Sequence, residues 1–231
     1  MRRLGIALLS LCLFTCASST RFAIEVSGLA SREIATKSYI ILPGADDLRA
    51  NDLQFMEVAR YVRGALARRG FVETSEANAA DIAVFLTYGI GDPKTRHYTR
   101  IVPVYGEIGG GTSTVSLSTY GADGVTTTHG TVTTSSTRGQ IGTNVSTDVV
   151  TTYFRYLVLD AWDLNQFRKS HETVPVWKTV LTSTGSSGDL RRVLPVMVAA
   201  GEPYVGTNTG KQLHINLGES DSRVTLVRSA Q

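Results

Sequence analysis

Four polar residues near the C-terminus are the best candidates for a binding site in this sequence. Asp189 and Arg191 follow a glycine- and serine-rich segment at residues 185–188, and Tyr204 and Asn208 lie in the loop beyond the next apolar run. The exposed amides of a helix N-terminus, with an arginine beside them, can hold an anion or a carboxylate-bearing glycan. The alternative is structural, with Asp189 capping the helix, Arg191 pairing with it or with solvent, and Tyr204 packing.

No other set of residues has the spacing of a catalytic or cofactor signature. The four histidines are far apart in the sequence: His97, His129, His171 and His214. The serines at 186–187 lack the spacing of a G-x-S-x-G nucleophile elbow, and the glycines at 106–111 lack the lysine of a phosphate-binding loop. We therefore predict no catalytic residue, no metal ligand and no cofactor, and we favour a non-enzymatic protein.

The N-terminus is typical of a bacterial export signal. Two arginines precede an apolar run at residues 4–14, which is too short for a bilayer that needs about 20 apolar residues. Residues 13–16 (Leu-Phe-Thr-Cys) resemble the lipobox of bacterial lipoproteins, in which the cysteine is acylated and becomes the new N-terminus; Phe14 and Thr15 are bulkier than usual there. We predict a lipoprotein-type signal over residues 1–19, with cleavage before Cys16 preferred.

A second ending of this leader stays open. Residues 17–19 (Ala-Ser-Ser) offer a small-x-small site for ordinary signal peptidase, and cleavage there would release a soluble periplasmic protein. An acylated Cys16 would instead anchor the chain in a membrane, because each buried methylene of its fatty chains contributes ~0.8 kcal/mol. By resemblance to lipoprotein sorting in bacteria with two membranes, Ala17 after the cysteine implies the periplasmic face of the outer membrane.

The charge balance and the cysteine count exclude two further classes. Lysine plus arginine number 23 against 20 aspartate plus glutamate, and the loss of Arg2 and Arg3 with the leader leaves 21 against 20, a mature charge near +1. A charge so small argues against nucleic acid as a partner, because duplex binding needs a basic face. No cysteine follows Cys16, so the mature chain has neither a disulfide framework nor a thiolate metal site.

Two segments have the apolar period of a helix. Over residues 51–69 one stripe is apolar, made of Phe55, Ala59, Val62 and Leu66. We expect Asn51 to cap this helix and Gly70 to end it. A second, shorter helix is predicted at about 189–200, where Pro195 makes it short, kinked or 3₁₀ at its start.

The rest of the chain predicts strands. Short β-rich or continuously apolar runs lie at residues 22–26, 37–42, 81–88, 101–105, 153–159, 176–182, 212–217 and 223–227. Pro103 favours an edge position for the strand at 101–105, because proline cannot donate to a ladder. The last two strands are predicted to form a terminal hairpin. Residues 109–152 are rich in threonine, serine and glycine and form either a hairpin or a mobile low-complexity loop. Because threonine favours pleated, half-buried surfaces, we favour a hairpin insert at about 109–152 within a single α+β domain spanning 20–231.

The mature chain resembles a group of uncharacterised bacterial lipoproteins of the domain-of-unknown-function type. The residues that carry the likeness are Lys37-Ser38-Tyr39, residues 65–71 (Ala-Leu-Ala-Arg-Arg-Gly-Phe), Ala80-Asp81-Ile82, Tyr88-Gly89, Gly188-Asp189-Leu190-Arg191, Leu194-Pro195 and Pro203-Tyr204-Val205-Gly206. The resemblance covers most of the mature chain, and its motifs mark turns and the ends of helices and strands rather than a site. It implies an exported α+β domain with no established chemistry.

These observations together predict an α+β fold with a mainly antiparallel, twisted sheet, one long amphipathic helix and one short C-terminal helix. They favour an exported, lipid-anchored envelope protein that acts as a non-enzymatic binding or structural module in the periplasm. Its partners would be the membrane, through the N-terminal lipid, and envelope proteins or cell-wall components. The alternative is a soluble periplasmic small-ligand binder or hydrolase whose site assembles only in three dimensions.

Overall fold

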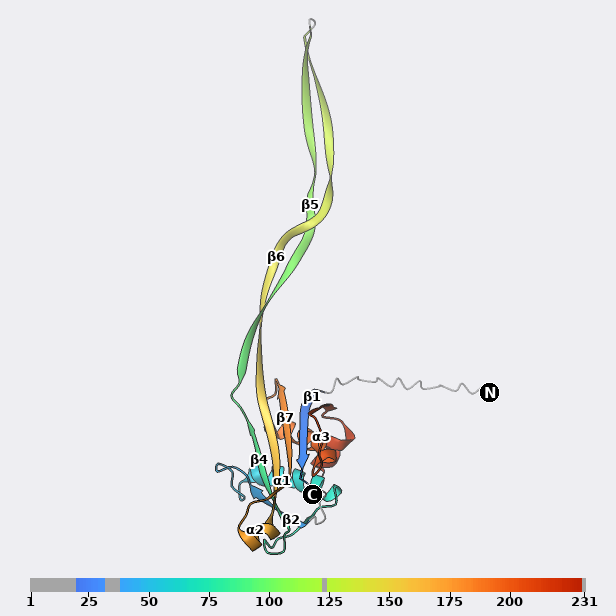
Figure 1. The fold of residues 1–231 in the computed structure, drawn as a ribbon. Helices are drawn as coiled ribbons and strands as arrows, with labels where there is room; N and C mark the ends of the chain where they lie inside the picture. Colours follow the sequence, from blue (N-terminus) through green and yellow to red (C-terminus); the bar gives the residue numbers. More distant parts are fainter. Residues whose placement is uncertain (1–19, 32–37, 122–123, 230–231) are drawn as a thin grey trace, which may run out of the picture. The chain divides into compact units, whose positions relative to one another are not determined.

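The chain divides into two compact units in a computed structural model that describes residues 20–31, 38–121 and 124–229 (Figure 1). One unit is Thr95–Thr151, which we call the ribbon. The other comprises the described residues up to Lys94 and from Thr152 onward, which we call the body. The export signal predicted at 1–19, with Cys16, lies outside the described residues.

The described residues form one mixed sheet and four helices. The strands follow the order β3-β2-β4-β6-β7-β1-β8, and β5 pairs with β6. Their bounds are β1 Arg21–Ala30, β2 Ser38–Pro43, β3 Val72–Glu73, β4 Ile82–Ile90, β5 Lys94–Gly121, β6 Gly124–Asp163, β7 Pro175–Gly185 and β8 Leu213–Gly218. The helices are α1 Leu53–Arg68, α2 Leu164–Ser170, α3 Leu190–Gly201 and α4 Ser222–Arg228, with a 3₁₀ turn at Glu202–Tyr204.

The prediction of a mainly antiparallel sheet with one long and one short helix is therefore wrong. Strand β2 pairs in parallel with β3 and with β4, while the other registers are antiparallel. The helices have 16, 7, 12 and 7 residues. The physical reason lies in the connection. Helix α1 carries the chain from the end of β2 back to the end of the sheet where β3 and then β4 begin, and such a crossover makes strands parallel.

Helix α1 forms where the apolar stripe predicts it, but its cap is one residue further along. The Asp52 carboxylate accepts hydrogen bonds from the amides of Gln54 at 2.8 Å and Phe55 at 3.1 Å, so Asp52 and not Asn51 caps the helix. Gly70 has a φ of 79°, in the left-handed region that glycine tolerates. The amide of the residue after Gly70 donates to the Leu66 carbonyl oxygen at 3.0 Å, which is the Schellman ending that the sequence predicts.

Helices α1 and α3 pack against one face of the sheet (Figure 1), and α4 contacts both of these helices. Alternate residues of the central strands are buried there, as the two-residue period of a strand requires. In β6 and β7 these are Leu157, Leu159, Ala161, Trp177 and Leu181, each at most 3% exposed. Helix α3 is buried along most of its length despite Pro195 within it. The hydrophobic core of the body lies between this face and these helices.

The C-terminal segment differs from the predicted terminal hairpin. Residues 223–227, predicted as a strand, lie in α4. Asp221 caps this helix, because its carboxylate accepts a hydrogen bond from the Arg223 amide at 3.0 Å. Val224 and Val227 are both buried, three residues apart, so a helix places both against the core. Packing thus overrides the strand preference of the valines. Strand β8 pairs with β1 instead.

The ribbon consists of parts of β5 and β6, and it begins before the predicted insert at 109–152. Residues 101–105, predicted as a separate strand, lie inside the 28-residue β5. Gly109, Gly110 and Gly111 have φ values of 74°, 86° and 156°, which mark an irregular stretch of β5 that only glycine adopts without strain.

Candidate functional site

The predicted residues at the start of α3 are engaged in local structure. The Asp189 carboxylate caps α3 and accepts hydrogen bonds from the amides of Arg191 at 2.9 Å and Arg192 at 3.4 Å. The Arg191 guanidinium forms an ion pair with Glu57 of α1, with Nε 2.9 Å from Oε2. The hydrogen bonds from Tyr61 and Arg191 keep the pKa of Glu57 below its ordinary value despite the opposing effect of burial. These contacts join two helices of the body.

The other two predicted residues lie at the far end of the same helix. Because α3 has 12 residues, it is about 18 Å long, and Tyr204 and Asn208 follow its C-terminus. Tyr204 is half-buried and packs against the core. The side-chain oxygen of Asn208 accepts a hydrogen bond from the Gly210 amide at 2.9 Å. The structure therefore does not bring the four predicted residues together.

The carboxylates of the described residues are dispersed, and several of them form ion pairs with a basic side chain. Within that part of the chain, no group of three or more histidine, cysteine, aspartate or glutamate side chains could hold a metal ion. Glu219 accepts hydrogen bonds from Arg192, with the shortest contact 2.6 Å, and lies 3.5 Å from Arg228. The hydrogen bonds from Arg192 lower the pKa of Glu219, so this carboxylate is held ionised and is unsuited to donate a proton.

A buried arginine that the sequence analysis did not identify ties three segments of the body together. Arg155 of β6 is 1% exposed. Its guanidinium donates to the Ser183 hydroxyl at 3.0 Å and to the Ser187 carbonyl oxygen at 2.8 Å, and burial lowers its pKa. The sequence contained a sign of this burial. Arg155 lies two residues before Leu157 in the same strand, so both side chains point to the same face of the sheet, the face that packs in the core. Arg155 positions the loop that leads into α3.

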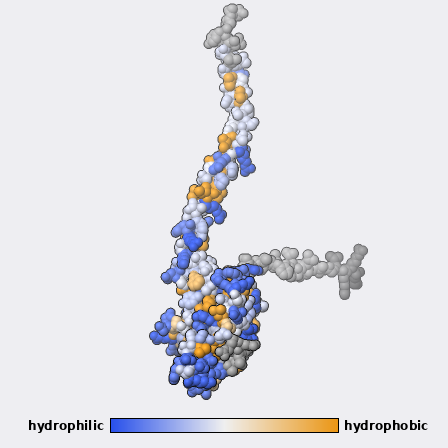
Figure 2. Space-filling view, in the orientation of Figure 1, coloured by the Kyte–Doolittle hydropathy of each residue, from blue (hydrophilic) through white to orange (hydrophobic). Residues whose placement is uncertain are grey.

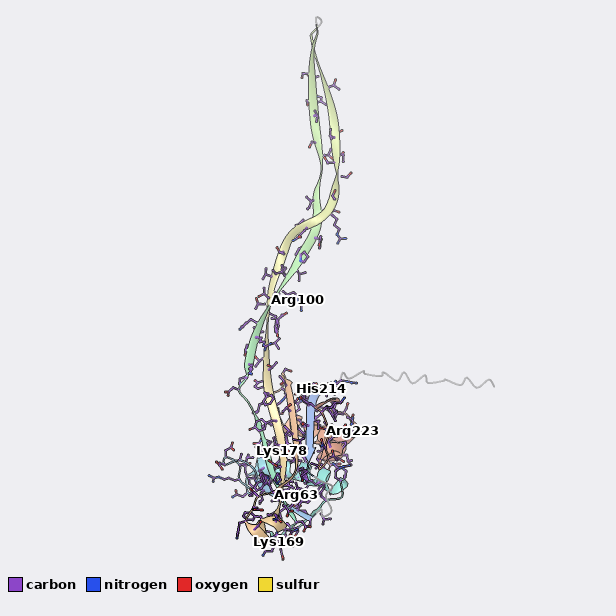
Figure 3. All side chains as sticks on the ribbon, in the orientation of Figure 1. Arg63, Arg100, Lys169, Lys178, His214 and Arg223 are labelled. Carbon is purple, nitrogen blue, oxygen red and sulfur yellow. The ribbon has the colours of Figure 1, made fainter. Side chains whose placement is uncertain are left out.

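Two apolar depressions flank Trp162 on the other face of the sheet. The first has a volume of about 460 Å³ and is lined by Leu42, Phe85 and, from α2, Phe167. The second, of about 400 Å³, is lined by Trp162 together with Leu29, Val176 and the ion pair of Asp160 with Lys178, whose atoms are 2.9 Å apart. Figure 3 labels Lys178 on the body. The volumes suit a small apolar ligand, and the largely apolar lining offers it binding contacts.

The ribbon presents a row of apolar side chains on one of its faces. A Cβ placed on Gly106 would lie 2.5 Å from Cδ1 of Ile141, and one on Gly139 would lie 2.6 Å from Cδ1 of Ile108, so these pairs share a face. Apolar residues near them in the same two strands are also exposed. The set, which we call the apolar face, consists of Val102, Val104, Ile108, Ile141 and Val145, which are 41–61% exposed.

Polar contacts join the two strands of the ribbon elsewhere. Hydroxyl groups approach across the strands at 3.2 Å for Thr95 and Thr151, and at 3.4 Å for Thr112 and Thr133. Arg100, labelled in Figure 3, lies 3.8 Å from Asp148 in an exposed ion pair. Figure 2 shows apolar residues, in orange, recurring between polar ones along the ribbon. The ribbon is therefore held by strand pairing and short polar contacts rather than by a core of its own.

None of the described helices is both long and apolar enough to cross a membrane.

Comparisons with known proteins leave the family open. No protein family model matches this chain, and no curated protein matches it. Among solved structures it is similar to a PDZ domain protein from Parabacteroides distasonis, with 10% sequence identity and a TM-score of 0.37. The match covers 87% of this chain and 39% of the other, so the chain spans less than half the length of that protein. A likeness this weak assigns no function.

Proposed function

We propose that this protein is an exported, lipid-anchored envelope protein that acts as a non-enzymatic binding module through its ribbon. The observation that carries the proposal is the apolar face, where Val104 and Ile141 remain 41% and 59% exposed. A two-stranded hairpin is marginal by itself in water, and contiguous exposed apolar side chains mark interaction sites. A ribbon of this kind gains stability when another surface covers it.

The membrane anchor rests on the leader sequence, because Cys16 closes an apolar run with small residues after it. Intact mass and membrane fractionation of the wild type and of Cys16→Ser, expressed in a bacterium with two membranes, test this part. We expect an acyl mass increment and membrane retention that both disappear in the variant. A soluble species that starts at Thr20 would overturn the anchor and leave the ribbon hypothesis standing.

The binding role of the ribbon is tested by photo-crosslinking in cells. A photoreactive phenylalanine analogue replaces Val104 in one strain and Leu226 in another, because Leu226 of α4 is 50% exposed but lies in the body. We expect crosslinked products from position 104 and none from position 226. Equal yields from both positions, or none from either, would refute a specific role of the ribbon.

The depressions beside Trp162 favour a second candidate function, the binding of a small apolar ligand. The larger one, at about 460 Å³, falls within the range of about 300–1,000 Å³ that is common for ligand sites. Anilinonaphthalene sulfonate serves as the probe. We expect saturable binding that weakens in Phe85→Ser and is unchanged in the control variant Leu226→Ser. Binding that does not saturate, or that ignores Phe85, would exclude this site.

A further inference from the structure

Both long edges of the ribbon are unpaired in the described residues. Strand β5 pairs with β6 only. Strand β6 gains neighbours only within the body, where β7 pairs with it from Tyr153 onward and β4 from Arg155 onward. Before that point its second edge is open. Unpaired N–H and C=O groups along such edges are a template for another strand.

The ribbon lacks two of the features that keep strand edges apart, because its strands are long and carry no lysine. Natural edges are usually short or carry lysine and proline. Residues 95–151 contain no lysine and a single proline, Pro103. Their three arginines (Arg96, Arg100, Arg138) offset three carboxylates (Glu107, Asp123, Asp148), so the formal charge is zero. Two such ribbons do not repel each other.

The charges on the two strands are also complementary. Arg100 of β5 lies beside Asp148 of β6 within one ribbon, at 3.8 Å. If β6 of one copy pairs with β5 of the next in that same register, Asp148 again meets an arginine, the Arg100 of its neighbour. Opposite charges across strands favour pairing in this register by up to about 1 kcal/mol.

The length of the ribbon is sufficient for a stable interface. A 28-residue strand extends about 90 Å, and an edge about 10 Å thick would bury about 900 Å² on each copy. A typical stable interface buries about 800 Å² per partner. The apolar face alone spans about 25 Å and would bury far less, so pairing along the whole edge is needed.

We propose, building on the ribbon's proposed role as the binding element, that its partner is a second copy of this chain. The outer edge of β6 in one copy pairs antiparallel with the outer edge of β5 in the next, in the ribbon's own register. The turns between β5 and β6 of all copies then lie at the same end of the shared sheet, and the apolar faces of neighbouring copies are adjacent. Because the two surfaces in contact differ, the arrangement repeats and gives a ring or an open filament.

Sedimentation of the purified, exported full chain over a concentration series tests the association. We expect oligomers whose dissociation constant rises at least about tenfold in Val104→Lys and in Ile141→Lys, because lysine on a strand face opposes edge pairing. Leu226→Lys, on α4, is the control and leaves association unchanged. A monomer at every concentration, including one that binds lipid vesicles through the ribbon, overturns the proposal.

Single-cysteine variants test the geometry. Thr112 and Thr133 face each other across the ribbon, so Thr112→Cys and Thr133→Cys are placed on separate chains. Whichever way the leader is cut, the mature chain has no other free thiol. We expect a disulfide-linked dimer when the two variants are mixed and none from either alone, because like strands would lie about 10 Å apart. Oligomers that crosslink from one variant alone, or not at all in the mixture, refute the pairing of β6 with β5.

Discussion

Strand β6 runs through both units, and its two parts differ in what surrounds them. In the body, Leu157 is fully buried between neighbouring strands and the helices, whereas in the ribbon Val149 of the same strand is 58% exposed. Both residues are apolar and belong to the same continuous strand. The difference shows that strand pairing alone does not make a core, and that the stability of the body comes from the helices on one face of its sheet.

The polar contacts of the two units also differ in burial. The body holds a buried Arg155 whose donors reach a hydroxyl and a carbonyl oxygen. The ribbon holds the exposed pair of Arg100 and Asp148, whose side chains are 73% and 54% exposed. A buried guanidinium must be satisfied in full, while an exposed pair contributes about 0–1 kcal/mol. Substitutions should therefore have unequal effects in the two units.

The largest effect is expected from the core position of β6. Leu157→Ala should lower the free energy of unfolding by about 3 kcal/mol, because it removes buried methyl groups and leaves a cavity. Val149→Ala, at its exposed counterpart, should change it by less than about 0.5 kcal/mol. Urea unfolding at low protein concentration measures both. Equal losses would break the comparison, because they would require a packed environment for the ribbon in the monomer.

The second effect concerns the two arginines. Arg155→Ala should lower the free energy of unfolding by about 2 kcal/mol, because it leaves buried oxygen atoms without donors. Arg100→Ala should leave it unchanged within about 0.5 kcal/mol. Thermal and urea unfolding of both variants provide the test. A neutral Arg155→Ala would show that the loop at residues 186–188 does not depend on this side chain.

A smaller effect on the free energy of unfolding is expected at the N-terminus of α1. Asp52→Ala should cost about 1 kcal/mol, because it removes the acceptor for the first amides of the helix. Asn51→Ala, one residue earlier, should be neutral within about 0.3 kcal/mol, since Asp52 holds the cap. Urea unfolding at neutral pH compares the two. A larger loss of stability in Asn51→Ala than in Asp52→Ala would show that Asn51 caps the helix.

The smallest effect is expected from Glu219, and it depends on pH. Arg192 lowers the pKa of this carboxyl in the folded state, so the stabilisation is present above the unfolded value of about 4.3 and is lost as pH falls through the folded value. Glu219→Gln should therefore cost about 0.5 kcal/mol at pH 7. This difference should vanish in acid. Asp148→Asn, in the ribbon, serves as the comparison and should show no such cost.

Some features of the candidate sites could be predicted from the sequence and others could not. Asp189 has the capping role that its position before an apolar helical stripe suggests, because a cap depends on residues two and three places away. Tyr204 and Asn208 follow the same helix, yet the helix length keeps them away from Asp189. The depressions at Trp162 collect residues from β1, β2, β4, β6, β7 and α2, so sequence spacing gives no sign of them.

The sequence by itself determined the local features: the stripe and the Schellman ending of α1, and the alternation that buries one side of β1, of β7 and of β6 within the body. These depend on neighbours within one or two turns or one strand period. Only the tertiary structure decided that β2 and β4 run parallel, that β8 pairs with β1, and that residues 223–227 form a helix. The physical reason is that strand partners and helix packing depend on contacts between residues far apart in the chain, where burial outweighs local propensity.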